Sequence, residues 1–263
     1  MTLRFPFPRL QLLSVAITAA ALLAAPRAAH SQGGNDFVIM KPRAQGAPPQ
    51  VFSNVLVTAV RGTKVSVRDA RGEIAYDLSQ IQEVRKAAPP EFASAQALIE
   101  GGEMEKALPL IKTVADNFKG LPTAWAADAT AMLGNIYLSL GKLPEAEAAF
   151  GDFERIYAGS GSLAASVGKA RLAAERKDFA GARAVAEPIV AEAMSKKNIS
   201  RAESQLFGQA YFVLGRIAEG EDKLPEAMEH YCRTVAIFYQ ERAVVKEAQK
   251  RIDELRQKGI TTP

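Results

Sequence analysis

A five-residue motif occurs twice in the chain without change. The sequence KLPEA fills residues 142–146 and returns 81 residues later at residues 223–227. Weaker copies occupy residues 103–107 and 178–182. The alanines that close the four copies are 39, 36 and 45 residues apart: Ala107, Ala146, Ala182 and Ala227. A recurrence at about 20 to 50 residues is typical of stacked supersecondary units, so the sequence predicts a repeat protein.

The residues around the second copy predict a pair of helices. Gly141 allows a tight turn after the first helix, and Pro144 stands where a second helix begins, a position that tolerates its missing N–H. The small residues Gly134 and Ala146 let the two helices approach, and Phe150 fills the space between layers. One such pair cannot cover its own apolar face, so we expect the copies to stack.

These positions resemble the tetratricopeptide repeat (TPR). The second copy carries the resemblance at Leu133, Gly134, Tyr137, Gly141, Ala146 and Phe150. A looser match has Leu214, Gly215, Ala227 and Tyr231, but Ala218 and Asp222 stand where the family usually has an aromatic residue and a glycine. The spacing exceeds the family's usual length of about 34 residues, which implies longer helices or loops. The resemblance covers residues 91–240 and implies a mainly α fold, a TPR-like solenoid of about four helix pairs.

The resemblance also implies a binding surface, because the first helices of such pairs line an extended concave face. The groove-facing positions are then Gln96, Asn135, Arg171 and Arg216. Two arginines and two amides are suited to gripping a peptide backbone or a carboxylate, although each of them taken singly is better explained as an ordinary solvated residue. On this hypothesis, Arg216→Ala weakens partner binding without unfolding the protein.

Residues 1–31 have the order of features of a secretory signal peptide. Two arginines and no acid precede an apolar stretch over residues 10–25, and Ala29-His30-Ser31 fits a small-x-small cleavage site. We expect cleavage after Ser31 and a periplasmic or otherwise exported protein. The alternative is an uncleaved membrane anchor, although a spanning helix needs roughly 20 apolar residues. An exported β segment followed by repeats also resembles envelope repeat proteins of Gram-negative bacteria.

Two segments with different sequence patterns lie between the predicted signal peptide and the repeats. Residues 32–50 are rich in Gly and Pro with little periodicity, which predicts a flexible linker. Residues 51–88 alternate as strands do, with turns at Gly62 and at residues 70–72, and predict a small antiparallel β module of three or four strands. So few residues bury little apolar area, and we expect this module to be stabilised by packing against the repeats that follow it.

The final segment, residues 241–260, carries one apolar stripe at Val244, Ala248, Ile252 and Leu255. We predict a C-terminal helix that caps the last repeat, with a short dimerising coiled coil as the alternative. The lone Cys232 cannot form an internal disulfide. We expect a buried structural thiol there, and the alternative is an intermolecular disulfide.

Residue types that commonly carry catalysis or bind metals are scarce. The chain has two histidines and one cysteine, and His30 falls in the predicted signal, which excludes the common Cys/His zinc sites. His230 and Cys232 point apart at a spacing of two on a helix. The Gly-rich segments lack phosphate-loop and dinucleotide patterns. We expect no catalytic residue, cofactor or metal. The one enzymatic alternative that remains is hydrolysis of a glycosidic bond by two acids that lie far apart in the sequence.

The charge of the chain does not favour nucleic acid as a partner. Three of the 33 bases and none of the 29 acids lie in residues 1–31, which leaves 30 bases against 29 acids. Nucleic-acid binding needs a concentrated basic surface. Together these features predict a non-catalytic adaptor or scaffold that binds a protein or peptide partner in the concave groove. The alternative is a cell-wall-associated protein whose β module contacts peptidoglycan or another glycan.

Overall fold

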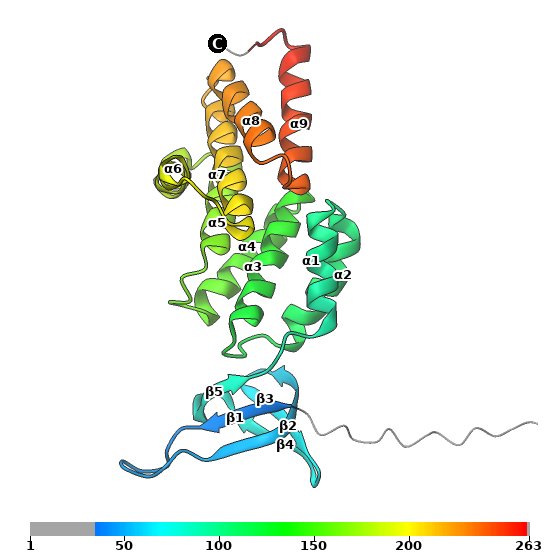
Figure 1. The fold of residues 1–263 in the computed structure, drawn as a ribbon, viewed down its shortest axis with the longest axis vertical. Helices are drawn as coiled ribbons and strands as arrows, with labels where there is room; N and C mark the ends of the chain where they lie inside the picture. The colour runs from blue at the N-terminus through cyan, green and yellow to red at the C-terminus, as the bar shows by residue number, and fades with distance from the viewer. Residues whose placement is uncertain (1–34, 262–263) are drawn as a thin grey trace, which may run out of the picture. The chain divides into compact units, whose positions relative to one another are not determined.

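The computed structural model describes residues 35–261 of the chain. Within them, a five-stranded antiparallel sheet is followed by nine α-helices (Figure 1). The expected fold class, a mainly α TPR-like solenoid preceded by a small antiparallel β module, is confirmed. The expected signal peptide at residues 1–31 lies outside the described residues.

The sheet has the strand order β4-β3-β2-β1-β5, and every neighbouring pair is antiparallel. Its buried side chains alternate along the strands, as Val55, Val57 and then Val60 do after a register shift. Gly62, at φ 60°, makes the tight turn between β2 and β3. The strands are β1 (Asp36–Met40), β2 (Val51–Arg61), β3 (Lys64–Asp69), β4 (Gly72–Asp77) and β5 (Ile81–Arg85), with a short 3-10 helix (Leu78–Gln80) before β5.

The prediction of a linker over residues 32–50 is wrong at β1, which lies inside the sheet and pairs with both β2 and β5. Val38 is fully buried and pairs with Val84, and Met40 lies in the same core. The surrounding glycines and prolines obscured a run of only five residues, DFVIM, whose alternate side chains are buried. The module therefore begins before residue 51 and has five strands, where three or four were expected.

The helices form four consecutive pairs and a final single helix. Each helix contacts its pair partner, and the first helices α3, α5 and α7 also contact one another along the array. Their bounds are α1 (Pro90–Glu100), α2 (Met104–Asn117), α3 (Ala124–Ser139), α4 (Leu143–Ile156), α5 (Leu163–Glu175), α6 (Phe179–Ser195), α7 (Arg201–Gly220), α8 (Leu224–Ile237) and α9 (Arg242–Gln257).

The same turn joins the two helices of every pair. One residue in each turn has a left-handed backbone, with φ of 76°, 71°, 66° and 60° at Gly102, Gly141, Lys177 and Asp222. The next residue then donates its N–H into the last turn of the first helix, as Lys142 does to the Tyr137 carbonyl at 2.8 Å. This arrangement satisfies carbonyls that a helix end leaves free. The last two pairs thus keep the turn without its usual glycine.

Glycines on the first helices make room for aromatic rings from the second helices. A Cβ on Gly134 would lie 2.7 Å from Cζ of Phe150, and a Cβ on Gly168 would lie 2.5 Å from the same atom. Phe150 of α4 therefore packs against both α3 and α5. Gly215 and Tyr231 repeat the arrangement in the last pair, where the Cβ distance would be 2.4 Å.

The apolar stripe of α9 is buried within the chain. Val244, Ala248 and Leu255 are at most 5 % exposed and belong to a core cluster that includes Tyr231 of α8. This stripe caps the last pair and is not free to form a coiled coil. Cys232 is half-buried against the same cluster.

The sheet and the first helices share one hydrophobic core. The indole Nε1 of Trp125 donates to the Lys86 carbonyl at 2.8 Å, and Lys86 Nζ pairs with Asp36 at 3.1 Å. Both charged side chains are about one-tenth exposed. Lys86 also lies over the Phe118 ring, 5.6 Å from its centroid. The β module therefore depends on α2 and α3 for part of its burial.

Candidate partner-binding pocket

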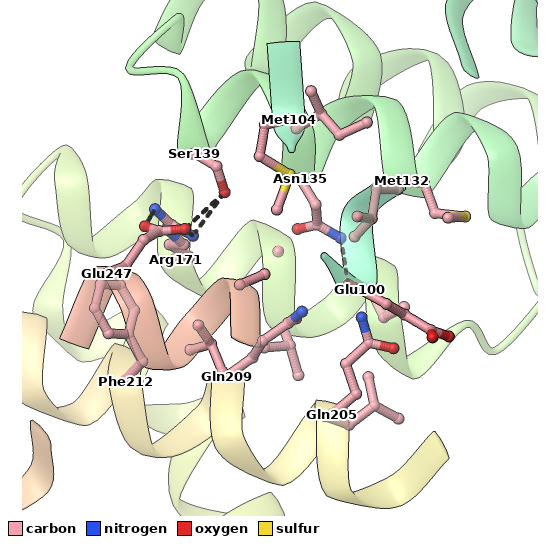
Figure 2. A pocket seen from close by; sticks show the side chains of 18 of the residues that line it. Glu100, Met104, Met132, Asn135, Ser139, Arg171, Gln205, Gln209, Phe212 and Glu247 are labelled. Carbon is pink, nitrogen blue, oxygen red and sulfur yellow. Dashed lines mark hydrogen bonds and ion pairs between the residues drawn. The ribbon is translucent and has the colours of Figure 1, made fainter. Parts of the chain in front are cut away.

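A cavity of about 280 Å³ lies among α1, α3, α5, α7 and the first turns of α9 (Figure 2). The lining comes from the first helix of each pair, from Met104 at the start of α2, and from α9. Its apolar lining consists of Ile99, Met104, Met132, Ile136, Ala164, Val167, Gly168, Leu206, Phe212, Val213, Ala243 and Val244. Its polar lining consists of Gln96, Glu100, Asp128, Asn135, Ser139, Arg171, Gln205, Gln209 and Glu247.

Helical spacing explains why these side chains meet. Along α3, Asp128, Met132, Asn135 and Ser139 follow one another at intervals of four, three and four residues. Residues at that spacing share one face of a helix. Gln205, Gln209 and Phe212 do the same along α7, so each first helix presents one stripe to the cavity.

One end of the pocket is closed by an ion pair between α5 and α9. The Arg171 guanidinium donates to both carboxylate oxygens of Glu247, at 3.2 Å for Nη1 and Oε1, and the Ser139 hydroxyl donates to Glu247 Oε1 at 2.8 Å. Arg171 also lies over the Phe212 ring, 5.0 Å from its centroid. The Arg171 and Glu247 side chains are 15 % and 25 % exposed, so this pair is largely withdrawn from water. Arg171 is the only arginine among the described residues that line the pocket, and Glu247 is already its ionic partner.

Two acids lie toward the other end. Glu100 pairs with Arg201 at 2.7 Å, and both of these side chains are more than half exposed. Asp128 is exposed and has no basic side chain within 4.0 Å among residues 35–261, and partial desolvation by its surroundings raises the pKa of its carboxyl. Figure 2 shows Glu100, Met132 and Gln205 on one side, and Ser139, Arg171 and Glu247 on the other. Asp128 belongs to the Glu100 end because it precedes Met132 by one turn.

Three of the four groove residues expected from the sequence line this pocket: Gln96, Asn135 and Arg171. Gln96 is exposed at the rim, and the Asn135 amide donates to the Ala164 carbonyl at 3.4 Å. Arg171 faces Glu247, so its charge is already paired within the chain. A carboxylate from a partner would first have to displace Glu247.

The fourth residue, Arg216, lies outside the pocket between α5 and α7. Its Nη2 donates to Glu175 at 2.6 Å and its Nη1 to Glu219 at 3.0 Å, while the Tyr231 hydroxyl donates to Glu219 at 2.8 Å. Burial lowers the pKa of Arg216, but the Glu175 and Glu219 carboxylates outweigh it, and the pKa is raised overall. Arg216 therefore links α5 and α7 through its ion pairs. We expect its removal to lower the stability of the fold before it weakens partner binding.

Several lining residues were not anticipated from the sequence. Asp128 and Met132 share the helix face of Asn135, and that spacing was a usable signal. Glu247 gave no such signal, because nothing local shows that the terminal helix reaches into the groove. Placing it requires knowledge of how strongly the array curves.

Over residues 35–261, no group of three His, Cys, Asp or Glu side chains is arranged to hold a metal ion. No helix in that range combines the length and apolarity that crossing a membrane requires.

No protein-family model matches the sequence, and no curated protein is significantly similar to it. Among solved structures, residues 41 to the end of MamA from Desulfovibrio magneticus RS-1 match with a TM-score of 0.36 and 18 % identity. That match covers 65 % of this chain and 96 % of the MamA fragment. The MamA RS-1 ArsTM double mutant matches with a TM-score of 0.33 and 18 % identity, over 66 % of this chain and 98 % of its own.

Proposed function

We propose that this chain is an exported, non-catalytic adaptor that binds a segment of a protein partner in the pocket of its solenoid. The observation that carries the proposal is the composition of the pocket. Buried apolar side chains such as Ile136 and Val213 form its floor, and the lining also includes the half-buried amides of Gln205 and Gln209 and the exposed amide of Gln96. Amide side chains both donate and accept hydrogen bonds, so they match the N–H and C=O groups of a peptide backbone.

The size of the pocket favours a short segment over a folded domain. A volume of about 280 Å³ is near the lower limit of ligand sites, which hold roughly 300–1,000 Å³. Such a volume accepts a few side chains of an extended peptide, while the rest of the segment follows the exposed face of α1.

Export is supported by the N-terminal pattern of residues 1–31, with its two early arginines, apolar stretch and small-residue site. A periplasmic or envelope location places the partner among exported proteins. This location also fits the resemblance to exported TPR proteins with a small β module.

The alternative partner is a glycan bound at the β module. The aromatic rings there, Phe52 and Tyr76, pack against each other at an interplanar angle of 36°, with centroids 5.2 Å apart, and both are half-buried. Each ring therefore uses one face on the other and has less surface for a sugar. The pocket is the better-supported site.

Photo-crosslinking in envelope fractions tests the proposal. A crosslinking amino acid replaces Gln205 at the pocket, and in a matched strain it replaces Gln257, which is exposed on α9 away from the pocket. We expect a specific protein adduct only from the Gln205 position. Gln209→Trp, which fills the pocket, should abolish that adduct, whereas Gln257→Trp should leave it unchanged.

Two results would refute the adaptor proposal. One is an adduct that persists when Gln209→Trp fills the pocket of a chain that is still folded by circular dichroism. The other is recovery of glycan in place of protein. Deleting the sheet is a poor control, because Phe118 and Trp125 would lose part of their cover.

A further inference from the structure

We infer that the pocket selects a partner segment that presents a lysine or arginine side chain, which the Asp128 carboxylate receives. This inference rests on the proposed function and specifies the chemistry of the bound segment. The inference follows from which charged side chains line the cavity, which of them already have an ionic partner, and the apolar surface between them.

The pocket contains three acids and one base. Glu100, Asp128 and Glu247 line it together with Arg171 alone. Arg171 and Glu247 neutralise each other at the closed end. The remaining charge is negative and lies at the end where Glu100 and Asp128 stand.

Those two acids differ in how accessible their charge is to a ligand. Glu100 has Arg201 as its partner, but the pair is exposed, and water screens such surface pairs strongly. Asp128 has no basic partner within 4.0 Å among the residues that the structure describes. The Asp128 side chain is exposed, yet desolvation by the residues around it raises the pKa of its carboxyl, which disfavours the charged form. A cation placed beside it would relieve that penalty.

An anionic segment meets the opposite conditions. The single arginine is held in two hydrogen bonds by Glu247 and stacks on Phe212, and it is only 15 % exposed. An incoming carboxylate would have to break this pair and would also approach Asp128, which has no ionic partner among residues 35–261, and Glu100, whose pair with Arg201 is exposed to water. The electrostatics therefore favour a cation over an anion.

The apolar part of the site fits the stem of a long cationic side chain. Met132 lies one turn from Asp128 on α3, and Met104 faces the same cavity from α2. Thioether side chains adapt to the shape of an apolar partner. The methylenes of lysine or arginine can lie on these sulfurs while the charged head reaches the carboxylate.

Selection of a random heptapeptide phage library tests this inference and separates it from the proposed function. The full chain is the bait, and phage that also bind Gln209→Trp are discarded, so that only pocket-dependent peptides remain. We expect these peptides to be enriched in Lys or Arg. Their affinity should fall about tenfold for Asp128→Asn, the change expected from loss of about 1.4 kcal/mol.

Asp116→Asn is the matched control, because Asp116 is also exposed on a helix and does not line the pocket. It should leave the affinity unchanged. Asp128→Asn should fold normally, since the carboxylate it removes has no ionic partner in residues 35–261. If Gln209→Trp fails to fold, Gln205→Trp takes its place as the filled-pocket variant.

Each result of the selection is decisive. Pocket-dependent peptides that lack basic residues, or that bind Asp128→Asn as tightly as the unaltered chain, overturn the inference and leave the adaptor function standing. A selection that yields no pocket-dependent peptide overturns both. Basic peptides that weaken with Asp128→Asn and not with Asp116→Asn support both.

Discussion

Replacing Gly134 by alanine should destabilise the protein, although the same change is usually favourable in a helix. Alanine is about 1 kcal/mol better than glycine in a helix interior. At Gly134, however, the new Cβ would lie 2.7 Å from Cζ of Phe150. The ring has no room to move away, because it also packs against Gly168 on α5, where a Cβ would lie 2.5 Å from the same atom.

The magnitude follows from these opposing contributions. Overpacking of a tight core costs about 1–3 kcal/mol, and a ring held between two helices belongs at or above the upper end of that range. With the gain of about 1 kcal/mol from helix propensity subtracted, we expect Gly134→Ala to lower the free energy of unfolding by about 2 kcal/mol. For a chain of this size that corresponds to a melting temperature lower by about 4–8 °C.

Gly151 provides the matched control. It lies in the interior of α4, it is exposed, and no heavy atom would come within 4 Å of a Cβ there. Gly151→Ala should therefore gain about 1 kcal/mol. Guanidinium denaturation followed by circular dichroism measures both variants, and their free energies of unfolding should differ by about 3 kcal/mol.

Phe150→Leu supplies a second check through a double-mutant cycle. The smaller side chain leaves room for the new methyl group, so Gly134→Ala should cost less in the Phe150→Leu background than in the unaltered chain. A Gly134→Ala variant as stable as the parent, or an equal cost in both backgrounds, would show that the ring is not confined as the structure indicates.

Three further changes test other contacts. Arg216→Ala should lower the free energy of unfolding by about 2–3 kcal/mol, because it leaves the largely buried Glu175 without an ionic partner and removes one of the partners of Glu219. Denaturant unfolding measures this, and unchanged stability would return Arg216 to the groove hypothesis. Asp222→Gly should raise the melting temperature, because glycine adopts the left-handed backbone of this exposed turn without the steric cost of about 0.5–1 kcal/mol that aspartate incurs. A lower melting temperature in calorimetry would contradict this prediction. Burial lowers the pKa of His230 below its ordinary value of 6.5, so the unfolded chain takes up the proton more readily and stability is lost as the pH falls below about 6.5. The drop in melting temperature between pH 7.5 and 5.5 should be smaller in His230→Gln, and an equal drop would exclude this histidine as a cause.

The repeat array was predictable because its information is local. The KLPEA copies mark the starts of α4 and α8, and the small residues Gly134 and Gly215 mark where an aromatic ring from the second helix fits. Each of these signals acts within one pair of helices. Spacing along the sequence therefore suffices to place them.

Two features escaped prediction because they depend on distant partners. β1 is only five residues long, and its strand pairing is supplied by β2 and β5. Glu247 reaches Arg171 across 76 residues and Ser139 across 108. Neither contact leaves a periodic trace, so the pocket's closed end could only be seen in three dimensions.

The meeting of the array's two ends limits how many repeats this chain can have. α9 contacts α1 as well as its neighbours α7 and α8, and Arg201 at the start of α7 pairs with Glu100 at the end of α1. In a linear array each unit touches only adjacent units, so a copy can be inserted or deleted at little cost to the rest. Here an added pair would carry α9 away from α1 and separate Glu247 from Arg171. We therefore expect natural length variation among related chains to fall in the loops, with four pairs retained.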